Sequence, residues 1–193
     1  MAKKKSGLTF IRKEKKFSNE TITEIISWAF IFVFAVFLAY VTVKAFGTRI
    51  VMAGDSMEPT LYNRQVVYVD KVTYNVKAPG HGDVVVFTPN GNKNQIYSVK
   101  RVVAVPGDTV KISGGVLYVN GEEEDRYTDS IADAGLASDE LSLGEDEFFV
   151  MGDNPNSSED SRSANIGPVL REEIDGKAWL HMAGGGMGIG RVR

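Results

Sequence analysis

The longest uninterrupted apolar stretch runs from Ile25 to Val43, nineteen positions without a charged side chain. At a rise of 1.5 Å per residue, a helix of this length covers about 28 Å, which is close to the hydrocarbon thickness of a bilayer. Its apolar residues lie on every face, whereas the core helix of a soluble protein has one apolar stripe. The pattern therefore predicts a transmembrane helix over residues 25–43.

The charges around this stretch are uneven. Residues 1–24 hold seven Lys and Arg against three acids, and only Lys44 and Arg49 follow the stretch closely. Positive charge concentrates on the cytoplasmic side of membrane proteins, so we expect residues 1–24 in the cytoplasm and residues 44–193 outside. A cleaved export signal is the alternative, but the apolar run is longer than such signals usually have. We expect a retained, single-pass anchor in the plasma membrane.

Beyond the anchor, short runs of apolar and β-branched residues alternate with turn signals rich in Gly, Pro and Asn. No long helical period appears there. This pattern is typical of a mainly β, antiparallel domain, sandwich-like or barrel-like, over residues 44–193. The expected strands are Thr48–Ala53, Gln65–Val72, Asp83–Phe87, Ile96–Val105, Val116–Val119, Phe148–Met151 and Ile174–His181.

The part of the chain after residue 24 is net acidic, because it holds all but three of the 25 acids. A surface of that sign is a poor partner for phosphates, so we expect no nucleic-acid binding. Residues 122–147 carry eleven acids against Arg126 alone, at spacings that fit no EF-hand loop, and we expect a solvated insertion. The segment Gly184–Gly190 lacks the residues of a phosphate loop and is expected to be a flexible or irregular end.

The chain has no cysteine and only two histidines, His81 and His181. These counts exclude a disulfide scaffold, a Cys nucleophile and a Cys-based metal site, and they leave little for a His-built one. We expect neither a cofactor nor a metal, and structural roles for both histidines.

Three segments carry candidate chemistry. The first, GDSMEPTL at residues 54–61, places Ser56 on a constrained turn just after a strand. The second, SVKRVVAVPGD at residues 98–108, puts Lys100 and Arg101 on opposite faces of an apolar strand. Either both cations reach solvent from an edge strand, or Lys100 is buried and becomes a base while Arg101 pairs with a carboxylate.

The third segment, GDNPNSSEDSR at residues 152–162, is a turn-rich loop by composition. Its acids and hydroxyls could hold Arg101 or orient an amine.

Together, in this order, the three segments closely resemble the sequence boxes of bacterial type I signal peptidases, and YVDKV at residues 68–72 resembles the intervening strand box. The resemblance spans residues 25–181. It implies cleavage of signal peptides from exported preproteins by a Ser–Lys dyad, after small residues in an Ala-X-Ala pattern. The implied partners are therefore signal peptides and the lipid bilayer; the sequence does not indicate an oligomeric state.

The resemblance also implies roles for particular residues. Ser56 would be the nucleophile, Lys100 the general base, and Ser158 the residue that orients the lysine amine. Gly54 stands where some members have a serine that stabilises the oxyanion, so the second oxyanion donor is undetermined here and the Ser56 backbone N–H is the first. Ion pairs implied to hold the site involve Arg101, Asp153, Asp160 and Arg162.

Three other hypotheses compete with general signal peptide removal. A processor dedicated to a few surface or pilus proteins would use the same chemistry. A self-cleaving regulator of the Ser–Lys class would need an internal cleavage site and usually a DNA-binding domain, against which the anchor and the acidic body argue. A surface β domain that binds partners without catalysis would leave Ser56 and Lys100 incidental.

Overall fold

The computed structural model describes residues 19–91, 97–184, 186 and 188–193. The chain divides into two compact units, residues 1–41 and residues 42–193, and each is considered by itself. The predicted basic N-terminal segment lies outside the described residues as far as residue 18.

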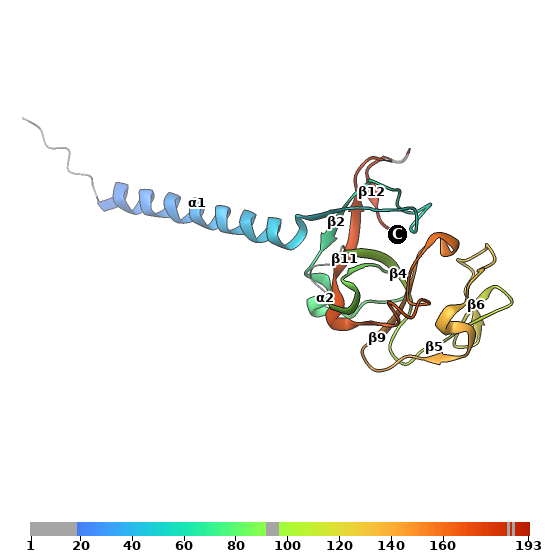
Figure 1. The fold of residues 1–193 in the computed structure, drawn as a ribbon. Helices are drawn as coiled ribbons and strands as arrows, with labels where there is room; N and C mark the ends of the chain where they lie inside the picture. Colours follow the sequence, from blue (N-terminus) through green and yellow to red (C-terminus); the bar gives the residue numbers. More distant parts are fainter. Residues whose placement is uncertain (1–18, 92–96, 185, 187) are drawn as a thin grey trace, which may run out of the picture. The chain divides into compact units, whose positions relative to one another are not determined.

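One helix, α1 (Asn19–Phe46), covers the predicted transmembrane stretch and extends past it at both ends (Figure 1). The helix extends into polar sequence at both ends, where the negative charge of Glu20 in the first turn and the positive charge of Lys44 in the last turn interact favourably with the helix dipole. Thr23 also donates its hydroxyl hydrogen bond to the Asn19 carbonyl. An 18-residue window within Asn19–Lys44 has a mean hydropathy of 2.4 and no buried side chain, so this helix is long and apolar enough to cross a membrane.

The second unit is built on an eight-stranded sheet in which every pairing is antiparallel, and the sheet curls in Figure 1. Seven strands follow the order β1-β2-β11-β3-β4-β9-β10, and β12 pairs with β11. Their bounds are β1 (Thr48–Val51), β2 (Val66–Asp70), β3 (Val84–Phe87), β4 (Ser98–Ala104), β9 (Glu147–Met151), β10 (Val169–Leu170), β11 (Ile174–His181) and β12 (Gly190–Arg191). The prediction of a mainly antiparallel β domain is confirmed.

The position of β4 inside the sheet explains why both of its cationic side chains are buried. It lies between β3 and β9, with Lys100 opposite Val85 and Arg101 opposite Val84 and Met151. Both side chains are buried. The alternative of an edge strand with both cations in solvent is therefore wrong.

A second sheet, of four strands in the order β7-β6-β5-β8, stands apart from the large one (Figure 1). Its strands are β5 (Thr109–Ser113), β6 (Val116–Val119), β7 (Glu122–Glu123) and β8 (Leu141–Ser142). The sequence analysis did not predict β5, although its residues alternate between partly exposed and buried positions.

The acidic insertion is only partly the solvated segment that its charge predicted. Its acids are mostly exposed, but four of its apolar side chains join the core formed by the small sheet and by Phe149 and Met151 of β9. The sequence pattern does not reveal these buried positions, because they are widely spaced among charged residues. These four side chains are Tyr127, Ile131, Ala137 and Leu143.

The remaining helical segments are short and connect strands. They are α2 (Thr73–Val76), η1 (Pro89–Gly91), η2 (Gly135–Ser138), η3 (Pro155–Ser157) and η4 (Arg171–Glu173). As predicted, no long helix follows α1 in the described residues.

Phe149 provides a test of this arrangement, because its fully buried ring links the large sheet to the core of the small one. We expect Phe149→Ala to lower the free energy of unfolding by about 3–5 kcal/mol, since it removes contacts and leaves a cavity. Chemical unfolding of the full chain in detergent measures the change. Leu170→Ala is the control, because that side chain is 39% exposed and its loss should cost much less. Equal losses in the two variants would contradict the packing described.

Candidate active site

Ser56 lies on the turn between β1 and β2, and two buried neighbours fix this turn. Met57 and Leu61 are completely buried in the core that also contains Val67 and Val99, and the Leu61 N–H donates to the Met57 carbonyl at 2.8 Å. Burial of Met57 and Leu61 therefore fixes the turn that carries Ser56. Ser56 itself is 9% exposed.

Lys100 reaches the same place from β4. Its Nζ lies 2.8 Å from the Ser56 Oγ, and the side chain is 7% exposed. The two residues that the sequence analysis singled out from separate segments are thus hydrogen-bonded.

Burial lowers the pKa of the Lys100 amine below its ordinary value of 10.5, because the charged form loses its hydration. The negative charges of Asp160 and Glu159 favour the charged form and oppose this shift, while the Arg162 charge reinforces it. No carboxylate in the described residues forms a salt bridge with the amine. The neutral form that can accept a proton is therefore more accessible in Lys100 than in an exposed lysine.

Arg101 lies on the opposite face of β4, where a carboxylate and other oxygen acceptors surround its charge. Its guanidinium binds both oxygens of Asp153, at 2.6 Å from Nε and 2.5 Å from Nη2, and it is 1% exposed. It also donates to the carbonyl of Gly82 at 2.7 Å and to the hydroxyl of Thr60 at 3.3 Å. This bidentate, fully surrounded ion pair holds the segment after β9 against β4.

A further partner of Arg101 comes from the far end of the sequence. The Arg193 carbonyl accepts a hydrogen bond from Nη2 at 3.0 Å, and Val192 packs against the core below Ser56. Gly190 belongs to β12 and pairs with His181. The expectation of a flexible or irregular end is therefore wrong for Gly190. The pairing there is short and glycine-rich, which gives no strand pattern in the sequence.

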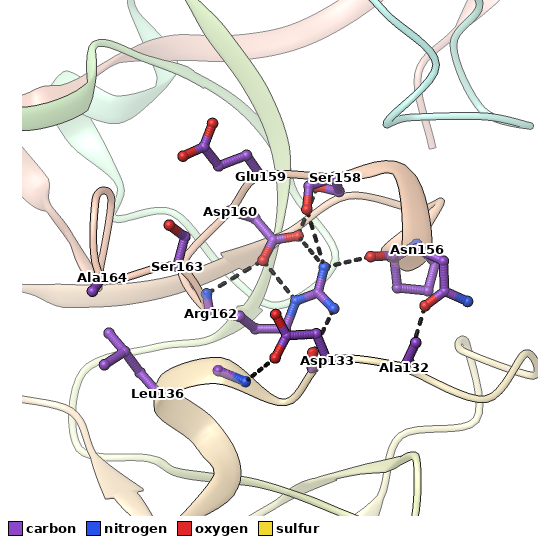
Figure 2. Close-up of a pocket in the computed structure, with 12 residues that line it drawn as sticks. Ala132, Asp133, Leu136, Asn156, Ser158, Glu159, Asp160, Arg162, Ser163 and Ala164 are labelled. Atoms are coloured by element: carbon purple, nitrogen blue, oxygen red, sulfur yellow. Dashed lines mark hydrogen bonds and ion pairs between the residues drawn. The ribbon is translucent and has the colours of Figure 1, made fainter.

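The second ion pair joins Asp160 and Arg162 within the loop after β9 (Figure 2). Nε and Nη2 of Arg162 bind the two carboxylate oxygens at 2.8 and 2.9 Å, and the guanidinium also donates to the carbonyls of Asp133 and Pro155. Asp160 is 1% exposed. The pair fastens the loop to the acidic insertion, to which Asp133 belongs.

Ser158 is directed at this pair. Its hydroxyl donates to Asp160 Oδ2 at 2.7 Å, and the described residues include no hydrogen bond between Ser158 and Lys100. The predicted role of Ser158 in orienting the lysine amine stays a prediction. Ser158 is instead bonded to Asp160, whose negative charge favours the protonated form of Lys100 and so raises its pKa.

Gly152 is a site residue that the sequence analysis did not single out. A Cβ atom at this position would lie 2.4 Å from the Ser56 carbonyl oxygen and 2.4 Å from the Ser158 hydroxyl. Its own N–H donates to Asp160 at 3.1 Å. Only glycine allows the backbone after β9 to approach the serine turn so closely. The sequence could not predict this approach, because the glycine is its only trace there.

Gly54 adopts a left-handed backbone conformation, with φ of +82°, and its N–H faces the Asn63 side chain at 3.3 Å. It offers no side-chain donor to an oxyanion. The Ser56 N–H, by contrast, makes no hydrogen bond to any described residue. Of the two backbone groups, only that of Ser56 is free to bind an oxyanion.

Two cavities open onto Ser56 and Lys100, and a third lies nearby. One of about 660 Å³ contains Ser56, Lys100, Gly54 and Glu159, and a narrower one of about 180 Å³ runs between residues 51–53 and 97–100, again touching Ser56 and Lys100. A third, of about 560 Å³, lies on the other side of the loop at Asp160 and Arg162 and is the cavity drawn in Figure 2. The dyad is thus open to an extended ligand from two directions.

Both histidines lie away from the dyad. The Nδ1 of His181 faces the Gln65 side-chain nitrogen at 2.9 Å, and His81 lies between the Val103 carbonyl and Asp108. Neither lines the cavities that contain Ser56. Their expected structural roles agree with these positions.

A serine hydroxyl bonded to a buried lysine with a lowered pKa is an arrangement suited to nucleophilic hydrolysis, the chemistry of the serine hydrolases. A family model described as "Signal peptidase, peptidase S26" matches residues 25–183. The chain therefore belongs to the signal peptidase family, peptidase S26, and it is a serine peptidase.

Two sequence relatives agree with this assignment. Signal peptidase I S of Bacillus subtilis (strain 168) is 32% identical over 166 residues, covering 79% of this chain and 85% of the relative. Signal peptidase IB of Staphylococcus aureus (strain COL) is 32% identical over 173 residues, covering 80% and 87%. A crystal structure of a signal peptidase I from Enterococcus faecalis V583 is 28% identical, covers 53% of this chain and 97% of that one, and has a TM-score of 0.42.

The close approach at Gly152 predicts a sharp effect of one methyl group. Gly152→Ala should push the loop after β9 away from Ser56, and we expect peptidase activity to fall at least about tenfold, because a misplacement of about 1 Å at a reacting group can cost up to about a hundredfold. Turnover by the purified full chain measures this. Gly80→Ala is the matched control, since nothing lies within 4 Å of a Cβ there. Similar activity in both variants would refute the steric argument.

Lys100 predicts a gain of stability when its charge is removed. The folded protein binds the Lys100 proton more weakly than the unfolded chain does, so below the ordinary lysine pKa this residue opposes folding. Lys100→Met, of similar length, should therefore raise the free energy of unfolding by about 0.5–2 kcal/mol at neutral pH. The difference should shrink as the pH approaches 10.5.

Chemical unfolding at several pH values measures this difference. The exposed Lys111→Met on β5 is the control and should change stability little. A Lys100→Met variant less stable than wild type at neutral pH would overturn the prediction.

Proposed function

We propose that this chain is a membrane-anchored endopeptidase that removes N-terminal signal peptides from exported preproteins through a Ser56–Lys100 dyad, cutting after small residues. The observation that carries the proposal is the 2.8 Å hydrogen bond between Lys100 Nζ and Ser56 Oγ in a buried pocket. Membership of the signal peptidase family supports the substrate class.

The reaction would begin with Lys100 in its neutral form. The amine takes the Ser56 proton as Oγ attacks the scissile carbonyl carbon, and the carbonyl oxygen becomes an oxyanion. Collapse of this intermediate breaks the peptide bond, the leaving amine receives the proton, and the upstream segment stays esterified to Ser56. Lys100 then takes a proton from water, whose oxygen attacks the ester carbonyl carbon. As the ester bond breaks, Lys100 returns this proton to the Ser56 Oγ, and the signal peptide leaves with a new carboxyl terminus.

The surrounding groups would hold this geometry. The Ser56 N–H is unpaired among the described residues and is suited to the oxyanion, where one donor is typically worth about 3–4 kcal/mol. Arg101 with Asp153, and Asp160 with Arg162, would fix the loop that approaches the serine turn. Gly54 leaves the second oxyanion donor unassigned, and Ser158 would orient the amine together with Asp160.

The helix α1 would anchor the enzyme, with residues 1–24 in the cytoplasm, residues 25–43 in the bilayer, and residues 44–193 as the extracytoplasmic catalytic domain. The basic residues before the apolar stretch support this orientation. A substrate tethered in the same membrane would then present its cleavage site close to the turn that follows β1 in the chain.

The test is cleavage of a membrane-anchored preprotein with an Ala-X-Ala site by the full chain in detergent. We expect cleavage after the second alanine, and loss of at least about a thousandfold in kcat/KM for Ser56→Ala and Lys100→Ala, because nucleophile and base act as one unit. Ser113→Ala and Lys111→Ala, both exposed on β5, should keep wild-type activity. Full activity in the dyad variants would disprove the mechanism.

The pH profile tests the base separately. Because burial lowers the Lys100 pKa, activity should rise as pH increases through that lowered value, which lies below the ordinary 10.5. A flat profile from neutral to alkaline pH, with chemistry rate-limiting, would argue against Lys100. A panel of preproteins tests how many substrates the enzyme accepts. Cleavage restricted to a few surface or pilus proteins would favour the hypothesis of a dedicated processor.

A further inference from the structure

Glu159 occupies a special place between two cavities. It lines the 660 Å³ cavity that contains Ser56 and Lys100, and it also lines the 560 Å³ cavity bounded by Leu136 and Ala164. Figure 2 shows its side chain extending away from the buried Asp160–Arg162 pair. An exposed carboxylate therefore stands on the wall that the dyad cavity shares with its neighbour.

This carboxylate has no cationic partner among the described residues. Its one hydrogen bond there is from the Asn165 amide, at 3.2 Å. The nearby Arg162 guanidinium is engaged by Asp160 and by backbone carbonyls, and Asp133 adds a second exposed acid to the neighbouring cavity. The wall thus carries negative charge that a bound ligand, rather than the protein, can neutralise.

The two cavities that touch the dyad differ in size and charge. The narrow one, of about 180 Å³, is lined by residues 51–53 and 97–100 and has room only for small residues, such as those before the scissile bond. The wide one, of about 660 Å³, has Ser157, Asn90 and the carboxylate of Glu159 in its lining. The longer polar side chains of the segment after the scissile bond fit the wide cavity better, because they find both space and hydrogen-bonding partners there.

We propose that Glu159 is a specificity-determining residue that favours preproteins with a cationic side chain in the first two positions after the scissile bond and disfavours acidic ones. This inference rests on the proposed function and goes beyond it, since it assigns a charge preference to the mature side of the substrate. Glu159 acts on substrate binding and is not required as a proton acceptor.

The expected effect is modest and electrostatic. Pairs between exposed charges shift binding by about two- to fivefold, and salt screens them over about 10 Å at 0.1 M. The ratio of kcat/KM for a basic over an acidic preprotein should therefore exceed one at low salt and decline as salt is added. A preference produced by side-chain size would not respond to salt.

The experiment uses the full chain in detergent and three preproteins that differ only in the two residues after the cut, which are both Lys, both Gln or both Glu. Wild type should prefer Lys over Glu by about two- to fivefold. Glu159→Gln should abolish the preference and Glu159→Lys should invert it. The control Glu140→Gln removes an exposed acid that lines none of these cavities and should leave the preference unchanged.

A second readout separates this role from a structural one. The Glu159 charge favours protonated Lys100, alongside Asp160 and against Arg162, so Glu159→Gln should move the acid limb of the pH profile to lower pH. The substrate ratios are therefore compared on the alkaline plateau, where Lys100 is neutral in every variant. Because Glu159 is exposed, its variants should unfold at the same denaturant concentration as wild type.

The outcomes distinguish the two proposals. If the Gln preprotein is cut in a Ser56-dependent manner but wild type and Glu159→Gln share the same Lys-to-Glu ratio, this inference fails and the proposed function stands. If wild type cuts none of the three preproteins, the proposed function fails and takes the inference with it. A ratio that is lost in Glu159→Gln and inverted in Glu159→Lys supports both.

Discussion

The hydrogen bond between Lys100 and Ser56 depends on holding an amine where water cannot easily solvate its charge. That condition explains why Lys100 lies on an interior strand rather than an edge, with β3 and β9 on either side. It also explains the two completely buried side chains, Met57 and Leu61, beside the serine. The sheet supplies the low-polarity surroundings, and the turn delivers the hydroxyl to them. The buried residues around Ser56 and Lys100 therefore both stabilise the fold and create the environment on which the proposed chemistry depends.

The adjacent cation shows the opposite solution to burial. Arg101 stays charged because a guanidinium does not lose its proton near neutrality, so its environment must neutralise it fully. Asp153 does so with two hydrogen bonds, and three oxygen acceptors from distant segments complete the set. One strand thus carries a cation that is paired and a neighbouring amine that is left without a salt bridge. Exchanging the two residue types would remove both properties.

Much of this arrangement could be predicted from the sequence, because alternation along β4 separates Lys100 from Arg101 and each expected strand coincides with an observed one or overlaps it. The parts that escaped prediction rest on features with little sequence signature. The Arg193 carbonyl is a backbone group, and any residue has one. Gly152 matters through distances to Ser56 that only folding creates. The buried residues of the acidic insertion are too widely spaced among charges to form a period.

The strand order also has a consequence for when the enzyme becomes active. β11 lies between β2 and β3, although it is formed from residues far later in the chain, and the segment that follows it reaches Arg101 and the core below Ser56. A chain that ends before β11 lacks the strand that joins the serine turn to the lysine strand. Long-range pairing of this kind forms only after both partners are present. Ser56 and Lys100 are therefore brought into register only once β11 has entered the sheet, which couples assembly of the site to the last steps of folding.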